Sequence, residues 1–343
     1  QAISYLDFDL PQEVIEREIF GARIHFKDLC LEIKKPYRIA ILVSRSIFDY
    51  YLLIKAKEAG STVLEGLTVK SLDINKNHVE IITNKGNYRC QLVIGCDGFN
   101  SIVAKYVRRP HLKDEYAICL ETSVPASEVE IDKYIHSAVD IHFNVADRGY
   151  GWVFPHRGYF SVGIGGTANR IGNPRPVMND FLLSTGFSNR IKVKGYPIPA
   201  GGIKRNLIAD RVLVAGDSAG FVDSFSGEGI AYAIRSGQIA AETAAKAIRN
   251  GNCSKSGLAS YVNSCKKEII YGLRYSLIVS KLMHHYPNFF IKLLASEEEV
   301  LSNYLDVSAR RITYKRYLLW LIVKSPIFLI RLARMNLVSH KNA

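Results

Sequence analysis

In the first part of the chain, the spacing of apolar and polar residues predicts first a helix and then strands. Residues 46–60 place apolar side chains at helical spacing and end in a glycine, which predicts a helix. Three strand-like runs follow at 62–72, 77–83 and 88–95, separated by turns rich in asparagine. The last run contains the continuous apolar stretch 91–95, which is typical of a buried strand.

Between about residues 111 and 204 the pattern changes, and runs of alternating apolar and polar residues predict an antiparallel sheet. A short apolar strand returns at 211–215, followed by a glycine-rich turn and an alanine-rich helix, and the chain reads as helices from residue 256. We therefore expect an α/β (α+β) fold. The segment 111–204 is inserted between 1–110 and 205–255, and 256–343 forms a helical region.

The composition is that of an ordinary globular protein with free cysteines. A chain of 343 residues can form two domains, and 48% hydrophobic with 22% charged residues is ordinary for a globular protein. The six cysteines form no C-x-x-C pair, and the nine histidines are scattered. This pattern indicates free thiols in a reducing compartment, and it predicts neither a disulfide framework nor a metal centre.

The net charge of +13 is concentrated at the end of the chain, where residues 251–343 hold 14 Lys/Arg against 5 Asp/Glu. Such a basic surface could attract nucleic acid, an anionic membrane or an acidic protein, or could simply be solvated. The apolar run 317–333 favours the membrane, but Lys324, Pro326 and Arg331 make it too interrupted for a comfortable membrane span. Further basic residues edge this run: Arg310, Arg311, Lys315, Arg316 and Arg334. We expect either a helix lying in the membrane interface or a helical cap over a substrate tunnel, and no nucleic acid.

The segment 214–230 is the sharpest chemical feature. A buried strand ends at Gly216, and the acidic Asp217 follows at the carboxyl end of the strand, where open α/β sheets place their ligands. Gly227 and Gly229 allow the backbone to approach a ligand closely and begin the next helix. The alternative is a strand–loop–helix crossover with a turn aspartate and no ligand.

A second strand, 93–95, also ends in an Asp-Gly turn, at Asp97 and Gly98, followed by Ser101. Such turns are common, so this one is informative only through its position about 120 residues before the Gly-Asp segment. Together with Arg45 and Asp49, these two segments resemble fingerprints of the para-hydroxybenzoate hydroxylase-like FAD superfamily.

The resemblance implies a Rossmann-like, three-layer FAD-binding domain that carries the inserted sheet as its substrate domain. It implies that Arg45, Asp217, Gly229 and Ile230 lie along bound FAD, and that the backbone of Val69 meets the adenine. The G-x-G-x-x-G unit that opens proteins of this superfamily does not occur here, so we expect the missing unit to precede residue 1.

The segment 150–155, followed by Val162–Gly165, resembles the aromatic motif of the geranylgeranyl reductases. In that family the aromatic strand lines the cavity that holds an isoprenoid chain against the flavin. The resemblance thus implies a substrate role for Tyr150, Trp152, Phe154 and Pro155; a plain amphipathic core strand is the alternative. This sequence departs from the family patterns at four positions, which weaken the substrate assignment more than the flavin assignment: Cys96, Asp147, Ser218 and Ser224.

The function implied is the FAD-dependent hydrogenation of C=C bonds in a polyprenyl (geranylgeranyl) lipid. The electron donor would be NAD(P)H or a ferredoxin-like protein, and the enzyme would be cytoplasmic and peripherally associated with a membrane. No catalytic proton donor is identifiable. The rival functions are a monooxygenase or halogenase of the same fold, a quinone-linked electron-transfer flavoprotein and a lipid-binding relic.

Overall fold

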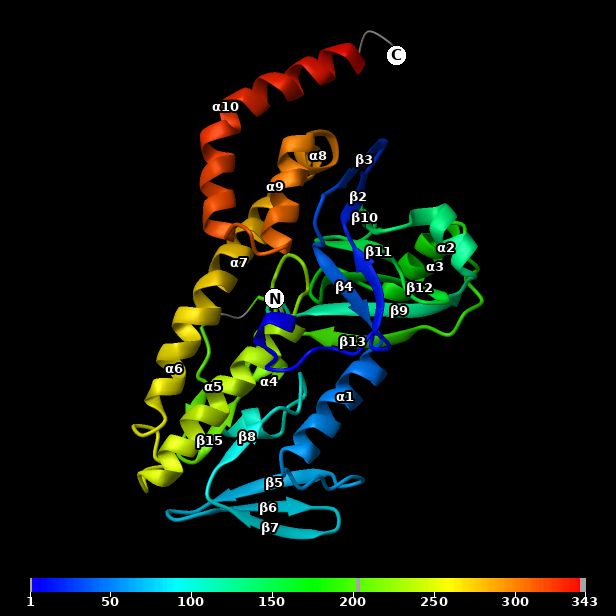
Figure 1. Cartoon of the computed structure of the whole chain (residues 1–343). Helices are drawn as coiled ribbons and strands as arrows, with labels where there is room; N and C mark the ends of the chain where they lie inside the picture. Colours follow the sequence, from blue (N-terminus) through cyan, green and yellow to red (C-terminus); the bar gives the residue numbers. More distant parts are fainter. Residues whose placement is uncertain (1, 202–203, 340–343) are drawn as a thin grey trace. The chain divides into compact units, whose positions relative to one another are not determined.

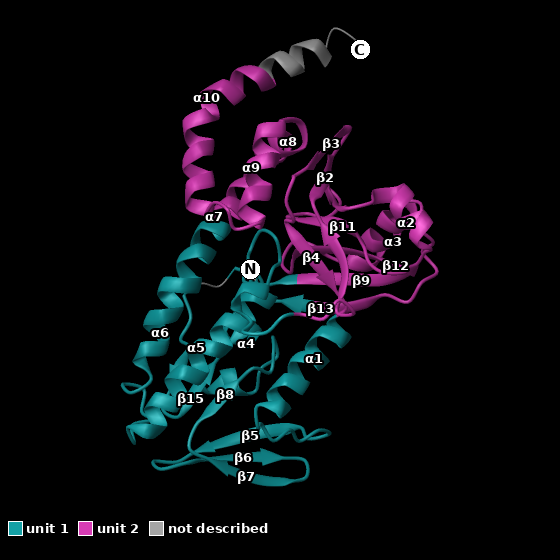
Figure 2. Cartoon of the chain, in the orientation of Figure 1, with its two compact units in different colours: residues 1–9, 45–117, 197–277 teal, residues 10–44, 118–196, 278–343 magenta. Residues whose placement is uncertain are grey.

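The computed structural model describes residues 2–201 and 204–339, with side chains described as far as residue 332. The chain forms two compact units, each assembled from three separate stretches (Figure 2). Unit 1 comprises Gln1–Asp9, Arg45–Ala117 and Pro197–Leu277, and unit 2 comprises Leu10–Ser44, Ile118–Tyr196 and Ile278–Ala343. These units divide the chain differently from the expected boundaries, because residues 10–44 and the last helices group with the inserted sheet.

Unit 1 contains two three-stranded sheets (Figure 1). The first has the order β14-β15-β8, with strands β14 (Ile208–Ala209), β15 (Val212–Val214) and β8 (Val93–Gly95). The second has the order β5-β6-β7, with strands β5 (Val69–Ile74), β6 (Val79–Thr83) and β7 (Gly86–Cys90). The β15–β8 pairing is parallel, whereas β14–β15 and the β5-β6-β7 pairings are antiparallel.

The helices of unit 1 are α1 (Arg45–Glu58), η2 (Val103–Tyr106), α4 (Gly216–Ala219), α5 (Ile230–Arg249) and α6 (Ala259–Cys265), with a short η1 (Ile3–Tyr5) at the start. A π-helical segment, η3 (Lys266–Ile270), leads into α7 (Tyr271–His285), along which the chain passes from unit 1 to unit 2. Helix α5 buries small residues such as Ala240 and Ala244 in a core shared with β15 and α6. Small side chains allow close packing of the helix, as its composition predicted.

The helix predicted at 46–60 is confirmed as α1, but two of the strand predictions need correction. The run 62–72 becomes extended only from Val69, because Gly66 has a φ of +68° and turns the backbone out of the β-region. The run 88–95 is two strands, β7 and β8, which belong to different sheets. Apolar periodicity does not reveal such a change of partner.

Unit 2 is built on a seven-stranded sheet with the order β13-β9-β12-β11-β10-β2-β3. Its strands are β2 (Gly21–Phe26), β3 (Leu29–Lys34), β9 (Ala117–Pro125), β10 (Ala138–Phe143), β11 (Gly149–Pro155), β12 (Tyr159–Thr167) and β13 (Lys194–Ile198). Neighbours β12–β11, β11–β10 and β2–β3 pair antiparallel, whereas β10 and β2 pair parallel. A separate ribbon joins β1 (Ile15–Ile19) to β4 (Ala40–Val43). The expected inserted sheet therefore exists, and residues 10–44 extend it by two strands.

Helices α2 (Glu128–Ile135) and α3 (Pro174–Ser184) cover one face of this sheet. Helix α2 begins with a capping box, in which Ser127 and Glu130 satisfy each other's backbone N–H groups. Met178 and Phe181 of α3 are buried against Val153 of β11. The opposite face of β11 carries Tyr150, Trp152 and Phe154, of which Trp152 is buried.

The described chain from residue 259 to 339 is helical, as expected. Unit 2 ends with α8 (Pro287–Ser296), α9 (Glu298–Ser308) and α10 (Tyr314–Ser339). Helix α10 contains Pro326, which lacks a backbone donor, and its ribbon bends along its length (Figure 1). Among the helices in the described residues, none combines the length and the hydropathy needed to cross a bilayer.

Candidate active site

The two acidic turns of unit 1 leave neighbouring parallel strands at the same edge. Val214 of β15 pairs with Gly95 of β8, and the N–H of Ala215 donates to the Gly95 carbonyl over 3.0 Å. Parallel strands present their carboxyl ends together, so Asp97 and Asp217 emerge on one side of the sheet. The sequence predicted each strand end, and the structure brings the two together.

Hydrogen bonds to the Asp97 carboxylate connect these two turns. Its carboxylate accepts hydrogen bonds from the N–H groups of Ile102 and Val103, over 2.7 and 3.2 Å, and from the Ser101 hydroxyl. The hydroxyl of Ser218, next to Asp217, also donates to Asp97, over 3.2 Å. Ser218, one of the departures from the family pattern, therefore cross-links the two motifs.

Asp217 lies beside the start of α5. A Cβ added to Gly229, the N-cap of α5, would be 3.4 Å from Asp217 Oδ1, so the missing side chain keeps the space beside this carboxylate open. Gly216 has a φ of +56°, which a glycine adopts without strain, and its N–H donates to the buried Ser236 hydroxyl over 2.9 Å. The turn that presents Asp217 is thus held from within unit 1.

The pKa of the Asp217 carboxyl is raised above its usual value because burial disfavours the charged form, and the charge of Arg45 partly opposes this shift. Arg45 begins α1, and its guanidinium Nη2 lies 2.8 Å from Asp49 Oδ2 one turn later. Arg45, Asp217, Gly229 and Ile230 therefore belong to one region of unit 1. Val69 opens β5 and packs against the hydrophobic core of the same unit.

The aromatic strand of unit 2 has two different faces. Gly151 and Val153 point to the α3 side, where Phe181 would lie 2.6 Å from a Cβ at position 151. Tyr150, Trp152 and Phe154 share the other face, with successive ring centroids 6.0 and 6.2 Å apart. Pro155 ends the strand and is buried opposite Phe160.

Gly163 and Gly165 of β12 explain the position of Trp152. Gly163 of β12 is directly opposite Trp152, and a Cβ there would lie 2.2 Å from the indole Cζ2. A Cβ at Gly165 would lie 3.0 Å from Cys119 Sγ and 3.6 Å from the indole Cζ3. The indole therefore lies across the Cα positions of β12, in space that only glycines leave free.

The register of the sheet extends this aromatic face across two more strands, which sequence reasoning missed. Ile141 and Phe143 of β10 pair with Trp152 and Tyr150, and Ile24 and Phe26 of β2 pair in turn with those β10 residues. Side chains of paired residues point to the same side of a sheet. We call this set the apolar wall: Ile24, Phe26, Ile141, Phe143, Tyr150, Trp152 and Phe154.

A chain of hydrogen bonds borders the apolar wall. The indole Nε1–H of Trp152 donates to the Ser161 hydroxyl over 3.3 Å, and Ser161 donates to Glu121 Oε1 over 2.5 Å. The hydroxyl of Tyr196 donates to the other oxygen of Glu121. These bonds orient the indole, and the sequence carried no signal for them because their partners are on β9, β12 and β13.

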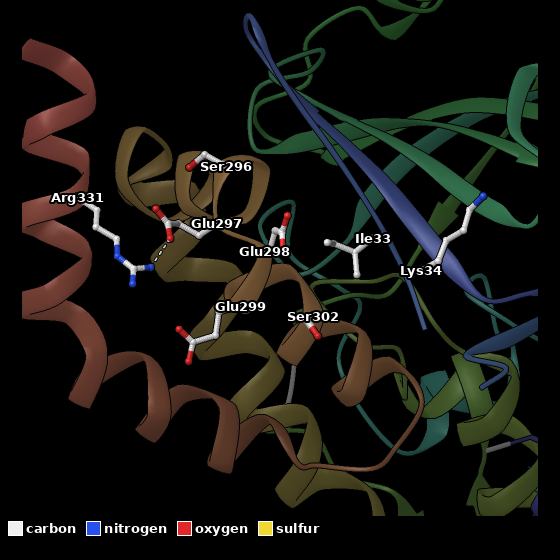
Figure 3. Close-up of a pocket in the computed structure, with 8 residues that line it drawn as sticks. All are labelled: Ile33, Lys34, Ser296, Glu297, Glu298, Glu299, Ser302 and Arg331. Atoms are coloured by element: carbon white, nitrogen blue, oxygen red, sulfur yellow. Dashed lines mark hydrogen bonds and ion pairs between the residues drawn. The ribbon is translucent and has the colours of Figure 1, made fainter. Parts of the chain in front are cut away.

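Unit 2 has two hollows, of which the second touches the apolar wall at Phe143. The first, about 650 Å³, lies between β3 and the last helices and carries Glu297, Glu298 and Glu299, with Arg331 paired to Glu297 (Figure 3). Its charges do not suit an isoprenoid chain. The second hollow, about 560 Å³, is lined by residues from β2, β10 and the ends of α2 and α3.

The chain is similar to several known proteins. No protein-family model matches the chain. It is 30% identical over 308 residues to an uncharacterized protein of Methanosarcina barkeri, covering 90% of this chain and 76% of that protein. It is 31% identical over 291 residues to the chloroplastic geranylgeranyl diphosphate reductase of Nicotiana tabacum, covering 76% of this chain and 61% of that enzyme. It is 29% identical over 300 residues to the digeranylgeranylglycerophospholipid reductase of Methanocaldococcus jannaschii, covering 83% and 73%.

Solved structures share the fold. A geranylgeranyl bacteriochlorophyll reductase-like protein of Thermoplasma acidophilum matches with a TM-score of 0.75 at 19% identity, covering 97% of this chain and 86% of that protein. The flavin-dependent halogenase CmlS matches with a TM-score of 0.61 at 17% identity, covering 79% and 54%. The mixed α/β fold expected from the sequence is confirmed. In sequence the chain is thus similar to geranylgeranyl and digeranylgeranylglycerophospholipid reductases, and in fold it is similar to a geranylgeranyl reductase-like protein and a flavin-dependent halogenase.

Proposed function

We propose that the protein is an FAD-dependent reductase that hydrogenates C=C bonds of a geranylgeranyl lipid. The observation that carries this proposal is the apolar wall, in which Trp152 lies flat across Gly163. A flat surface of aromatic and aliphatic side chains suits a long isoprenoid chain, which offers no hydrogen-bonding groups of its own.

The residues of unit 1 fit FAD. Asp217 emerges at the carboxyl end of β15 and can accept hydrogen bonds from ribityl hydroxyls, while Gly229 leaves the start of α5 open to a ligand. Arg45 and Ile230 belong to the same region, and Val69 would meet the adenine through its backbone. When bound, reduced FAD would supply the hydride.

The protein's own residues would orient the substrate and exclude water. The apolar wall would hold the isoprenoid chain by contact, and Pro155 would support the end of the strand from the helix-covered face. The Tyr196–Glu121–Ser161 chain would keep the Trp152 indole in one orientation. The electron donor would be NAD(P)H or a ferredoxin-like protein.

We further propose that α10 contacts a membrane surface from the cytoplasmic side. Its outer face exposes large apolar side chains, such as Ile322 at 60% and Val323 at 75%, while Tyr317 and Phe328 are buried on its inner face. Lys315 and Arg316 are exposed near its start, whereas Lys324 and Arg331 pair with Glu299 and Glu297. An apolar face beside exposed basic residues suits an anionic lipid interface. The side chain of Arg334 lies outside the described residues.

Replacement of Trp152 tests the substrate wall. We expect Trp152→Ala to lose most activity on geranylgeranyl lipid while keeping its flavin, because a buried aromatic contact is worth about 3 kcal/mol or more. Activity would be measured by mass spectrometry of the lipid products, and flavin by its absorbance.

The other tryptophan of the chain, Trp320 in α10, offers a matched control. Trp320→Ala removes the same side chain away from the aromatic strand and should retain reduction. Unchanged reduction by Trp152→Ala would show that β11 has only a structural role in the core. The monooxygenase or halogenase function would then be favoured.

A further inference from the structure

On the helix-covered face of the unit 2 sheet, three side chains of metal-binding type converge. Among the described residues, His25, Asp140 and His142 form a group whose ligand atoms all lie within 4.8 Å of one another. The register explains the convergence, because His25 of β2 pairs with His142 of β10, and Asp140 precedes His142 by two residues on the same face. Scattered histidines had predicted no such cluster, since β2 and β10 are far apart in the sequence.

The geometry is close to that of a coordination shell. His25 Nε2 lies 2.9 Å from Asp140 Oδ1, and His142 Nε2 lies 3.2 Å from Asp140 Oδ2. Ligands at about 2.0–2.1 Å around a tetrahedral ion are about 3.3 Å apart, so these separations need little adjustment. The two imidazoles stack with their centroids 4.1 Å apart, so their Nε2 atoms approach the same carboxylate side by side.

The remaining contacts of Asp140 leave room for an ion. Asp140 is fully buried, and the Arg23 guanidinium holds it with Nε–Oδ1 and Nη2–Oδ2 distances of 3.1 and 2.8 Å. A carboxylate has about four lone-pair positions, so beyond the donors Arg23 and Tyr134 one position is left, on Oδ1, and ligating carboxylates are commonly held this way. Tyr134 also donates to Oδ2, over 3.2 Å.

One nitrogen of the cluster, His142 Nε2, has an ion-pair contact but no well-aligned hydrogen bond. His142 Nε2 is buried and makes no hydrogen bond of acceptable geometry, although it lies near Asp140. Buried polar atoms are nearly always satisfied, so this one calls for an occupant. His25, Asp140 and His142 all line the 560 Å³ hollow, through which an ion and its water ligands could enter.

We propose that His25, Asp140 and His142 bind one divalent transition-metal ion. Two imidazoles and one carboxylate suit Zn²⁺ or Co²⁺, whereas Mg²⁺ and Ca²⁺ prefer oxygen ligands alone. The site is on the face of the sheet opposite to Trp152, so its role is to join β2 and β10 and not to touch the isoprenoid chain. The alternative is an ion-pair cluster in which Arg23 alone compensates Asp140.

The test is titration of the untagged full chain, stripped with a chelator, with Zn²⁺ and separately with Co²⁺ by calorimetry and visible absorption. We expect one ion per chain, a Co²⁺ spectrum of low coordination number, and no binding of Mg²⁺. His142→Ala and the more conservative His142→Gln should each weaken Zn²⁺ binding at least about tenfold.

His136→Ala is the matched control, because His136 is an exposed histidine of the same unit that pairs with Asp132. It should bind Zn²⁺ like the unaltered protein. No stoichiometric Zn²⁺ binding, or equal Zn²⁺ affinity in a folded His142→Gln variant, would overturn the metal site and leave the ion-pair cluster.

Discussion

At the scale of single residues, the proposed FAD site depends most on Asp217. Its carboxylate has no cation within ion-pair distance among the described residues, and burial raises its pKa, so the fold tolerates this charge at a cost. A buried acid that persists despite that cost is a common mark of a ligand site. We expect Asp217→Asn to lose FAD, as absorbance per protein would show, while Asp73→Asn, an exposed aspartate of β5, should retain it.

The same residue gives a prediction on stability. Because the folded state raises the pKa of Asp217, the folded protein holds this proton more tightly than the unfolded chain. Its contribution to stability is therefore lost as pH rises through the unfolded and then the folded pKa. Above both values, flavin-free Asp217→Asn should be more stable than the unaltered protein, because the amide carries no charge that burial disfavours. Denaturant unfolding at pH 4 and pH 7 would check this, and equal differences at both pH values would contradict it.

Glycine positions test the wall at the same scale. Gly163→Ala would place a Cβ 2.2 Å from the Trp152 indole and 2.6 Å from the Leu120 carbonyl oxygen. We expect a loss of about 1–3 kcal/mol in the free energy of unfolding, because the Leu120 contact is with backbone. Gly237→Ala in α5 is the control, since nothing lies within 4 Å of a Cβ there, and it should stabilise the protein by about 0.5–1 kcal/mol. The reverse order of stabilities would show that Gly163 has no packing role.

At the scale of elements, the sequence predicted those features that local pattern controls. Helix α1, the strands before Asp97 and Asp217, and the aromatic strand β11 were all predicted, because apolar periodicity and turn residues mark them locally. Features made by distant pairing were not predicted. The addition of β2 and β3 to the sheet, and hence the full apolar wall and the His25–His142 pair, depends on the parallel β2–β10 pairing. No local pattern marks such a partner.

The ion pairs of helix α10 are another feature that the local sequence pattern did not predict. Lys324 and Arg331 interrupt an apolar run in the sequence, yet both pair with glutamates at the start of α9 or just before it. The apolar face that remains exposed is therefore more continuous than the sequence suggested. Its outer residues include Leu319, Ile322, Val323, Ile327 and Ile330.

At the scale of the whole molecule, this exposed face of α10 predicts binding to membranes. We expect the full chain to sediment with anionic vesicles, and Ile322→Glu with Val323→Glu to reduce that binding strongly, because two buried apolar contacts become charges. Val129→Glu in α2, where the valine is 78% exposed, adds a charge elsewhere and should have little effect. Equal vesicle binding by all these proteins would exclude α10 as the contact.

The proposed reductase adds hydrogen to an isoprenoid lipid, and the mass of the product tests this function most directly. The protein, supplied with FAD, would be reduced with dithionite without oxygen and incubated with a geranylgeranyl lipid, and the products would be analysed by mass spectrometry. We predict products that gain two hydrogens for each double bond reduced. An unchanged lipid, or a product that gains oxygen or halogen only when oxygen is admitted, would contradict the reductase function.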